Sequence, residues 1–375
     1  MKTSRVTIPV GSFHISGGVK VLVLLANAMA RRGRKVLFLA PDYGAECPFP
    51  LEPGVSVRTI SCGPRFLPKE VRQIFYYLTL CVISARETDM ILPNYYLTAY
   101  CACISDLLQR RKPEILWYLQ AYEAGSHGTL ADAGPVSRFF RYHLAKLSYR
   151  LPVRIFCVSN WVKERIGRPD AKVAYPPALN LAVFKPSDRR PTIEGSVLTV
   201  GTIGRRGATK GYGNFLKTIS LIASERILVL VASPAAEEVP LPPNVPAERV
   251  HATTEEQMAA FYNRCDLFVL TSLMEGFPLP PLEAMACGCT VVVTACGGVS
   301  EYARDKVNCL VVPPDDPSWM AKQIRRLFRN PALRAALAEE GVRSVHAYGR
   351  EELAGQFLDR LGDSAPPQEL TSVVK

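Results

Sequence analysis

The chain has 375 residues, a formal net charge of +11 at pH 7 and eleven cysteines without a Cys-x-x-Cys pair. This length exceeds the size at which one hydrophobic core usually stops growing, so we expect two domains. The charge favours acidic partners such as nucleic acid, anionic lipid or phosphate-bearing substrates, and the cysteines argue against zinc and for a reducing cytoplasm. We expect neither a signal peptide nor a spanning helix, because no apolar run reaches the ~18 residues that a span needs.

The N-terminal segment has the pattern of a βαβ unit. Val6–Val10 predicts a strand, and the glycine-rich turn Gly11–Gly18 follows it. An apolar-rich helix that ends at Gly33 and a second strand over Val36–Ala40 complete the unit. This order implies a parallel sheet with a right-handed crossover.

A basic, amphipathic segment follows in the first half of the chain. Between Arg138 and Arg150, cations alternate with aromatic and apolar residues at a helical period. Two interpretations stay open. The segment is either an ordinary solvated helix or a helix that lies on an anionic membrane surface.

The proline-rich segment Tyr175–Pro186 predicts a connection between two domains, because Pro blocks both a helix and a central strand. We place the boundary near residue 188, which gives α/β domains over 1–187 and 188–348. The second domain repeats the first pattern. Its expected elements are a strand over Val197–Val200, a glycine-rich turn to Gly213, a helix over Asn214–Ser224, a strand over Ile227–Ala232, a loop over Pro234–Pro246, helices over Asp316–Asn330, Pro331–Val345 and Glu351–Leu361, and a frayed tail over Ala365–Lys375.

The acidic turn, Glu275-Gly-Phe-Pro-Leu-Pro-Pro-Leu-Glu283, carries most of the functional information. A proline at position 280 or 281 fits the start of a helix, and Gly288 fits the position just past its end. We therefore expect Glu275 in a loop and Glu283 in the first helical turn, where unpaired N–H groups favour anionic or hydroxyl-rich ligands. The two carboxylates are either an acid–base pair, grips for sugar or ribose hydroxyls, or structural groups.

A basic, glycine-rich loop opens the second domain. It spans Val200–Gly213 and contains Arg205, Arg206 and Lys210. Such a loop either neutralises a diphosphate or is simply solvated, and it matches neither a Walker loop nor the G-x-G-x-x-G fingerprint. Since no Asp-x-Asp pair occurs, we expect no metal and no cofactor, and the cations must stabilise the diphosphate instead.

The acidic turn together with Gly297–Glu301 and Asn308–Pro317 resembles the C-terminal half of family 4 retaining glycosyltransferases. Looser similarity runs through His14–Gly18 and Val158–Trp161. The resemblance implies the GT-B fold, with two Rossmann-like domains facing across a cleft. It further implies an acceptor-binding first domain, a nucleotide-sugar-binding second domain, and a final crossover helix with a tail over residues 349–375.

The resemblance also implies roles for single residues. Glu275 contacts the donor sugar, Glu283 holds the ribose, and Arg205 and Lys210 stabilise the leaving diphosphate. The strand-end glycine, Gly201, is followed by Thr202 where the family has Arg, so Arg205 and Arg206 remain alternatives. The other residues implied in donor binding are Gly17, Gly18, Gly276, Phe277, Pro278 and Leu279, and the first-domain catalytic candidate is His127, with His14, Gln120 and Glu123 as rivals.

We therefore expect a cytoplasmic, metal-independent, retaining hexosyltransferase. Its partners are a nucleotide-diphosphate sugar and a bacterial polysaccharide or lipid-linked saccharide acceptor, with peripheral contact to an anionic membrane and without nucleic acid. Two alternatives stay open. They are a nucleotide-sugar epimerase or phosphorylase on the same fold, and a basic nucleic-acid-binding protein, although no ribonucleoprotein motif, zinc finger or clear helix-turn-helix is present.

Overall fold

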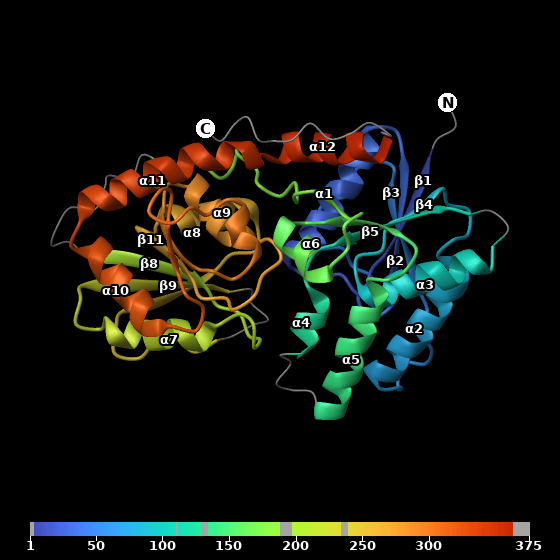
Figure 1. Cartoon of the computed structure of the whole chain (residues 1–375), viewed down its shortest axis with the longest axis horizontal. Coiled ribbons are helices and arrows are strands. Elements are labelled where there is room, and N and C mark those ends of the chain that lie inside the picture. Colours follow the sequence, from blue (N-terminus) through green and yellow to red (C-terminus); the bar gives the residue numbers. More distant parts are fainter. Residues whose placement is uncertain (1–3, 110–111, 129–133, 188–196, 234–238, 363–375) are drawn as a thin grey trace.

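The computed structural model describes residues 4–109, 112–128, 134–187, 197–233 and 239–362 (Figure 1). Within these residues the strands form two parallel sheets, one of seven strands in the order β3-β2-β1-β4-β5-β6-β7 and one of six in the order β10-β9-β8-β11-β12-β13. Two doubly wound sheets confirm the expected two-domain α/β fold. The predicted boundary at residue 188 and the tail Ala365–Lys375 lie outside the described residues.

The strands of the first sheet are β1 Arg5–Pro9, β2 Lys35–Pro41, β3 Val55–Ile60, β4 Met90–Ile91, β5 Glu114–Leu119, β6 Arg154–Cys157 and β7 Lys172–Val173. Its helices are α1 Gly17–Arg31, α2 Lys69–Ile83, α3 Tyr96–Leu107, α4 Glu123–Gly128, α5 Pro135–Ser148 and α6 Asn160–Ile166. Figure 1 shows α1 on one face of this sheet and α2, α3 and α5 on the other. Helices on both faces explain why the central strands are almost continuously apolar.

The strands of the second sheet are β8 Leu198–Ile203, β9 Ile227–Ser233, β10 Ala247–His251, β11 Leu267–Leu270, β12 Thr290–Thr294 and β13 Leu310–Val312. Its helices are α7 Tyr212–Leu221, α8 Glu255–Asn263, α9 Leu279–Ala286, α10 Pro317–Phe328, α11 Pro331–Val345 and α12 Arg350–Gly362, with short 3₁₀ turns at η1 Gly298–Glu301 and η2 His346–Tyr348. The predicted βαβ unit is present here too, but β8 ends at Ile203 and not at Val200.

The first helix shows how the sequence sets its own limits. The Ser16 side chain accepts a hydrogen bond from the Val19 N–H at 3.3 Å and so caps the start of α1. Gly33 has a φ of +80°, a left-handed conformation that glycine adopts without strain, and it follows the helix end as predicted. The helix therefore points its free N–H groups at the carboxyl edge of the sheet.

The two sheets share one apolar core. The largest buried cluster includes Trp117 and Phe156 of the first sheet and Phe268 and Val291 of the second. The last helix, α12, runs from the second sheet back to the first along one edge of the molecule (Figure 1). Its Phe357 is buried against Tyr118 and Phe156 of the first sheet. The C-terminal helix thus fastens one sheet to the other.

Candidate active site at the junction of the two sheets

The acidic turn connects β11 to α9 at the carboxyl edge of the second sheet. The Glu275 N–H donates to the Cys296 carbonyl at 2.7 Å, and the Gly298 N–H donates to the Glu275 carbonyl at 3.0 Å. These bonds hold Glu275 in a loop, as predicted.

The predicted placement of Glu283 in the first helical turn was wrong. Helix α9 begins at Leu279, and both prolines fit its first turn, so Glu283 lies in the second turn.

Glu275 and Lys210 form a direct ion pair. The Lys210 Nζ lies 2.9 Å and 3.1 Å from the two carboxylate oxygens of Glu275, and the Ser272 hydroxyl donates to Oε1 at 2.9 Å. The structure therefore brings together two residues that the sequence places far apart. Gly211, next to the lysine, has a φ of +65°, and a Cβ there would lie 1.8 Å from the Thr271 carbonyl oxygen. Only glycine allows the basic loop to lie this close to the acidic turn.

Glu283 lies in a buried ionic network that crosses the junction. Its Oε1 accepts from the Lys20 Nζ at 3.1 Å, and its Oε2 accepts from the Tyr262 hydroxyl at 3.0 Å. Lys20 also lies 3.0 Å from Glu255, which in turn pairs with Arg350. The side chains of Lys20 and Glu283 are only 14% and 9% exposed, so these charges depend on one another rather than on water.

The network shifts the pKa values of Lys20 and Glu255. Burial alone lowers the pKa of Lys20, but the charges of Glu283 and Glu255 outweigh it and raise that pKa above its ordinary value. Burial raises the pKa of the Glu255 carboxyl, and Lys20, Asn180 and Arg350 together lower it below its ordinary value. The charged forms of Lys20 and Glu255 are thus favoured near neutral pH.

Two helix N-termini meet at the acidic turn. A Cβ on Gly17 at the start of α1 would lie 3.4 Å from Leu279 Cδ1 at the start of α9. In the described part of the chain, the N–H groups of Gly17, Gly18, Gly276 and Phe277 donate to no protein acceptor. Free N–H groups at two converging positive helix ends form a site that favours an anion.

The basic loop corrects one expectation from the sequence. Because β8 extends to Ile203, the glycine at the strand end is Gly204, and Arg205 follows it directly as the resemblance requires. Gly201 lies inside the strand, where a Cβ would be 2.3 Å from the Cys265 sulfur, so the structure gives it a packing role. Arg205 is half-buried and Arg206 exposed, which favours Arg205 as the cation facing the site.

Phe277 and Pro278 contribute backbone rather than side chains. The Phe277 ring is buried against Tyr175, Tyr302 and Tyr348, with centroids 5.4 to 6.0 Å away. The Pro278 carbonyl already accepts from the Tyr302 hydroxyl at 2.5 Å. The aromatic cluster fixes the turn, and the N–H of Phe277 remains available to a ligand.

The first-domain candidates occupy different places. The Gln120 side-chain amide donates to the Gly18 carbonyl at 3.2 Å, and the backbone carbonyl oxygen of Gln120 would lie 2.1 Å from a Cβ on Gly276. Gln120 therefore touches both the glycine turn of α1 and the acidic turn. His127 lies against Tyr95 and Tyr96: its Nε2 is 3.2 Å from the Tyr95 hydroxyl, and its buried Nδ1 has no partner among the described residues. His14 is exposed.

Burial shifts the pKa values of Glu123 and His127, two of the first-domain candidates. It raises the pKa of Glu123 to about 8, although the Tyr96 N–H donates to the carboxylate at 2.8 Å. Burial, and then the charge of Arg141, lower the pKa of His127. At neutral pH His127 is thus uncharged and Glu123 is mostly protonated.

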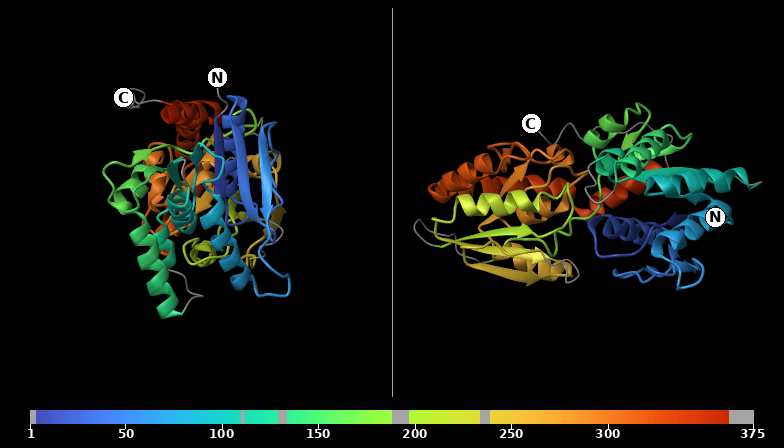
Figure 2. Two further views of the ribbon diagram at one scale, coloured as in Figure 1. Left: turned by 90° about the vertical axis from the view of Figure 1, so that its right-hand side faces the viewer. Right: turned by 90° about the horizontal axis from the view of Figure 1, so that it is seen from below.

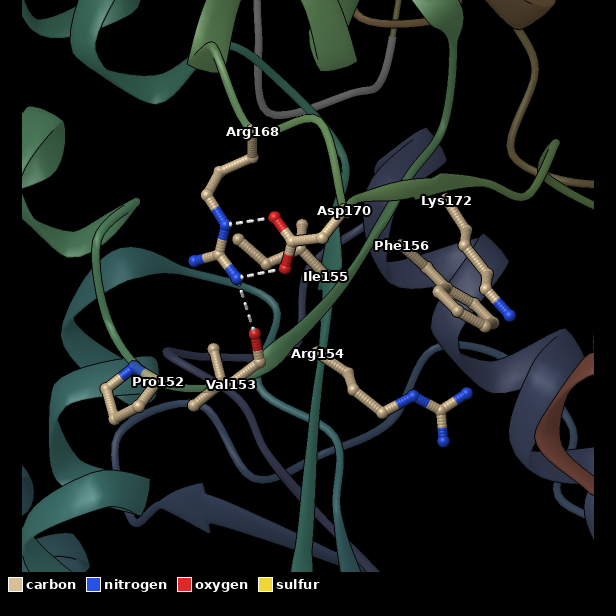
Figure 3. A pocket seen from close by; sticks show the side chains of 8 residues that line it. All are labelled: Pro152, Val153, Arg154, Ile155, Phe156, Arg168, Asp170 and Lys172. Carbon is tan, nitrogen blue, oxygen red and sulfur yellow. Dashed lines mark hydrogen bonds and ion pairs between the residues drawn. The ribbon is translucent and has the colours of Figure 1, made fainter. Parts of the chain in front are cut away.

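A surface hollow at the edge of the first sheet lies apart from this junction (Figure 3). Its Arg168 is already bound to Asp170 and to the carbonyls of Tyr149, Leu151 and Val153. We therefore do not assign it to the active site. Over the described ranges no cluster of His, Cys, Asp and Glu fits a metal ion, and no helix combines the length and apolar composition of a membrane span.

Comparison with known proteins identifies the chemistry. The family described as Glycosyl transferases group 1 matches residues 194–330, which contain the basic loop and the acidic turn. This match supports the resemblance to family 4 glycosyltransferases and identifies the chain as a glycosyltransferase. It is 26% identical to a D-inositol 3-phosphate glycosyltransferase from Acidothermus cellulolyticus, over 96% of this chain and 90% of that protein.

Solved structures show the fold. Sucrose-phosphate synthase from Thermosynechococcus elongatus aligns with a TM-score of 0.77 at 19% identity, over 96% of this chain and all of that one. HepE from Anabaena in complex with UDP-glucose aligns with a TM-score of 0.72 at 17% identity, over 96% and 99% of the two chains. The glycosyltransferase thus has the GT-B fold that the sequence led us to expect.

Sequence reasoning missed most of the buried network around Glu283. Lys20, Glu255, Tyr262 and Arg350 come from three elements, α1, α8 and α12, and no motif links them. One signal was available: Lys20 is a lone charge in the apolar first half of α1, two residues after Gly18. A charge in such a place needs a buried partner.

Replacing Lys20 with Met should leave Glu255 and Glu283 buried without their shared cation. Removing one partner from a buried pair costs about 3–5 kcal/mol, so the free energy of unfolding near pH 7 should fall by that order. The raised pKa of Lys20 and the lowered pKa of Glu255 place the full effect between about pH 5 and pH 10, and it should shrink below that window as the carboxylates protonate.

Urea unfolding of the wild type and Lys20→Met across this pH range measures the difference. Lys112→Met is the matched control, since Lys112 pairs with Asp106 at 3.3 Å but is 56% exposed. It should cost no more than about 1 kcal/mol. Equal losses in the two variants, or a Lys20→Met loss that does not depend on pH, would contradict the network.

Proposed function

We propose that this glycosyltransferase is a metal-independent, retaining enzyme that moves a hexose or deoxyhexose from a nucleotide sugar to a bacterial surface polysaccharide or lipid-linked saccharide. The observation that carries the proposal is the meeting of two helix N-termini and the Lys210 ammonium at one acidic turn. A diphosphate is the part of a nucleotide sugar that such a site recognises. The likeness to HepE, solved with UDP-glucose, supports a donor of this class.

Glu283 is proposed to hold the ribose hydroxyls. Each carboxylate oxygen accepts one hydrogen bond in the structure, from Lys20 or from Tyr262, and each keeps a second lone pair. A cis-diol can therefore bind both oxygens without displacing either partner. The hydrogen bonds from Lys20 and Tyr262 fix the direction of the carboxylate, which strengthens its hydrogen bonds to the ribose hydroxyls.

The diphosphate is proposed to lie between α1 and α9. There it meets the free N–H groups of Gly17, Gly18, Gly276 and Phe277, with the cations Arg205, Arg206 and Lys210 on the basic loop at one side. As the bond between sugar and phosphate breaks, negative charge grows on the leaving group. Preorganised cations stabilise that charge more in the transition state than in the ground state, and so they perform the work of a metal.

Glu275 is proposed to bind the donor sugar and to orient Lys210. Its carboxylate holds the lysine through both oxygens and is itself fixed by Ser272. With departure and attack on the same face of the sugar, no covalent nucleophile from the protein is required, and the anomeric configuration is retained. Glu275 then keeps the hydroxyls and the ammonium in place while the acceptor enters.

The two domains are proposed to bind different substrates, one the acceptor and the other the donor. The proposal assigns the acceptor to residues 1–187, the donor to residues 188–348, and the return crossing to the helix within residues 349–375. It places the enzyme in the cytoplasm, in peripheral contact with the inner face of the plasma membrane, where lipid-linked acceptors are found. Burial of Phe357 against the first sheet supports the crossing.

The direct test is transfer from a panel of nucleotide sugars, with excess chelator present and the anomer of the product read by NMR. We expect one donor to be consumed, with retention, and at the same rate with and without chelator. Glu275→Gln should lower kcat by about 10²–10³-fold, because it removes a charge that positions Lys210 in the transition state. Glu339→Gln on the exposed side of α11 is the control. A steep loss with chelator, or wild-type turnover in Glu275→Gln, would contradict the proposal.

The first-domain residue beside the sugar is either His127, which the resemblance implies, or Gln120, whose contacts reach the acidic turn. Since the Gln120 side chain holds the Gly18 carbonyl in the glycine turn of α1, we expect Gln120→Ala to lower kcat by at least about tenfold. His127→Gln should change kcat less, because the His127 ring packs against Tyr95 and Tyr96 of its own domain. Steady-state kinetics of the two variants decides between Gln120 and His127. A larger loss of kcat in His127→Gln than in Gln120→Ala would favour His127 as the catalytic residue.

A further inference from the structure

The first domain carries an apolar surface that none of the described residues covers. On α5, Val136, Phe139, Phe140, Leu144 and Leu147 form a stripe at helical spacing and are all exposed, with Phe139 at 59% and Phe140 at 65%. The residues of α5 that are buried are Ala145 and Ser148, on the opposite side of the helix. The first ten residues of α5 therefore bury none of their side chains in this protein.

The neighbouring helices continue this surface. On α2, Ile74, Phe75, Leu78 and Val82 are exposed on the side opposite the buried Tyr76 and Leu80. Helix α3 lies between the two, because the Tyr100 hydroxyl donates to the Leu144 carbonyl of α5 at 3.0 Å and Cys101 contacts the Tyr77 carbonyl of α2. Figure 2 shows α2 and α5 projecting from the same end of the first domain. We name these nine exposed residues the α2–α5 surface.

An exposed stripe of this size needs a partner. Isolated helices of this length are marginal in water, and most of their stability comes from burying an apolar face. Monomeric soluble proteins seldom leave such a contiguous apolar patch open. A partner other than the described residues is therefore expected to cover α5.

The positive charge of α5 favours an anionic lipid surface over a second copy of this chain as the partner. Helix α5 contains Arg138, Arg141 and Lys146 and no acidic residue, and Arg150 follows it. A second copy docked through the same surface would bring these cations against their own equivalents, because a twofold interface is self-complementary. An anionic bilayer instead attracts each Lys or Arg near its surface by about 1 kcal/mol and accepts the apolar stripe at the headgroup boundary.

We propose that the α2–α5 surface docks this enzyme on an anionic lipid bilayer, with the Phe139–Phe140 side of α5 inserted among the headgroups. This inference deepens the membrane contact of the proposed function by naming the surface and the lipid charge. Docking here also serves the active site, since α4 precedes α5 in the chain and packs at the junction, where Gly125 lies against Met274. A lipid-linked acceptor then approaches the junction from the membrane side.

Co-sedimentation with vesicles tests the inference apart from the chemistry. Wild-type full chain should bind vesicles that contain phosphatidylglycerol, bind phosphatidylcholine vesicles weakly, and release as salt is raised. The double variant Phe139→Ser/Phe140→Ser should bind these vesicles at least about tenfold more weakly, because two aromatic side chains are no longer transferred from water to the bilayer. Val307→Ser/Leu221→Ser, which removes two apolar residues that are 48% and 44% exposed on the second domain, should bind as the wild type does.

The oligomeric state and the melting temperature of the variant test the inference further. Sedimentation velocity should show no dimer that the Phe139→Ser/Phe140→Ser change abolishes. The change should not lower the melting temperature much, since both rings are mostly exposed and their ring contacts, with each other and with His143, lie within α5 itself. A dimer lost in the Phe139→Ser/Phe140→Ser variant, a large drop in its melting temperature, or vesicle binding that is unchanged in it would overturn the proposal. Turnover of a water-soluble acceptor by the variant should stay at the wild-type rate, so failure of docking and failure of the proposed reaction are separate results.

Discussion

The ammonium group of Lys20, held between Glu255 and Glu283, is the interaction on which the arrangement of the two domains depends. It links the first turn of α1 in one domain to α8 and α9 in the other. A buried ionic network of this kind contributes little net stability compared with apolar packing, but it tolerates only one relative position of its members. That position sets the free N–H groups at the start of α1 opposite those at the start of α9.

The rest of the site follows from sheet geometry. Parallel strands deliver their following loops to one edge, and two such edges face each other here, so loops that lie far apart in the sequence become neighbours. Gly276 and Gly298 are required for that closeness, because a Cβ on either would fall within about 2 Å of a backbone oxygen, at 2.1 and 1.7 Å. The active site is therefore a consequence of backbone approach, to which a few charged side chains add chemistry.

The sequence predicted those parts of the fold that depend on local signals. The βαβ unit, the end of α1 at Gly33 and the span of α11 follow from apolar period and glycine, which act over a few residues. The end of β8 was misplaced because Gly201 looks like a turn glycine, although its neighbour in space, Cys265, is what excludes a side chain there. The partners of Glu283 were not predictable, since each comes from a different element and only the folded chain brings them together.

A crystal structure of the enzyme with an intact nucleotide-sugar donor tests the central claim most directly. The account predicts ribose hydroxyls on the Glu283 carboxylate, with Lys20 and Tyr262 still bound to it, and the diphosphate between the N-termini of α1 and α9. A donor seated away from Glu283, or a diphosphate that meets neither helix end, would contradict it.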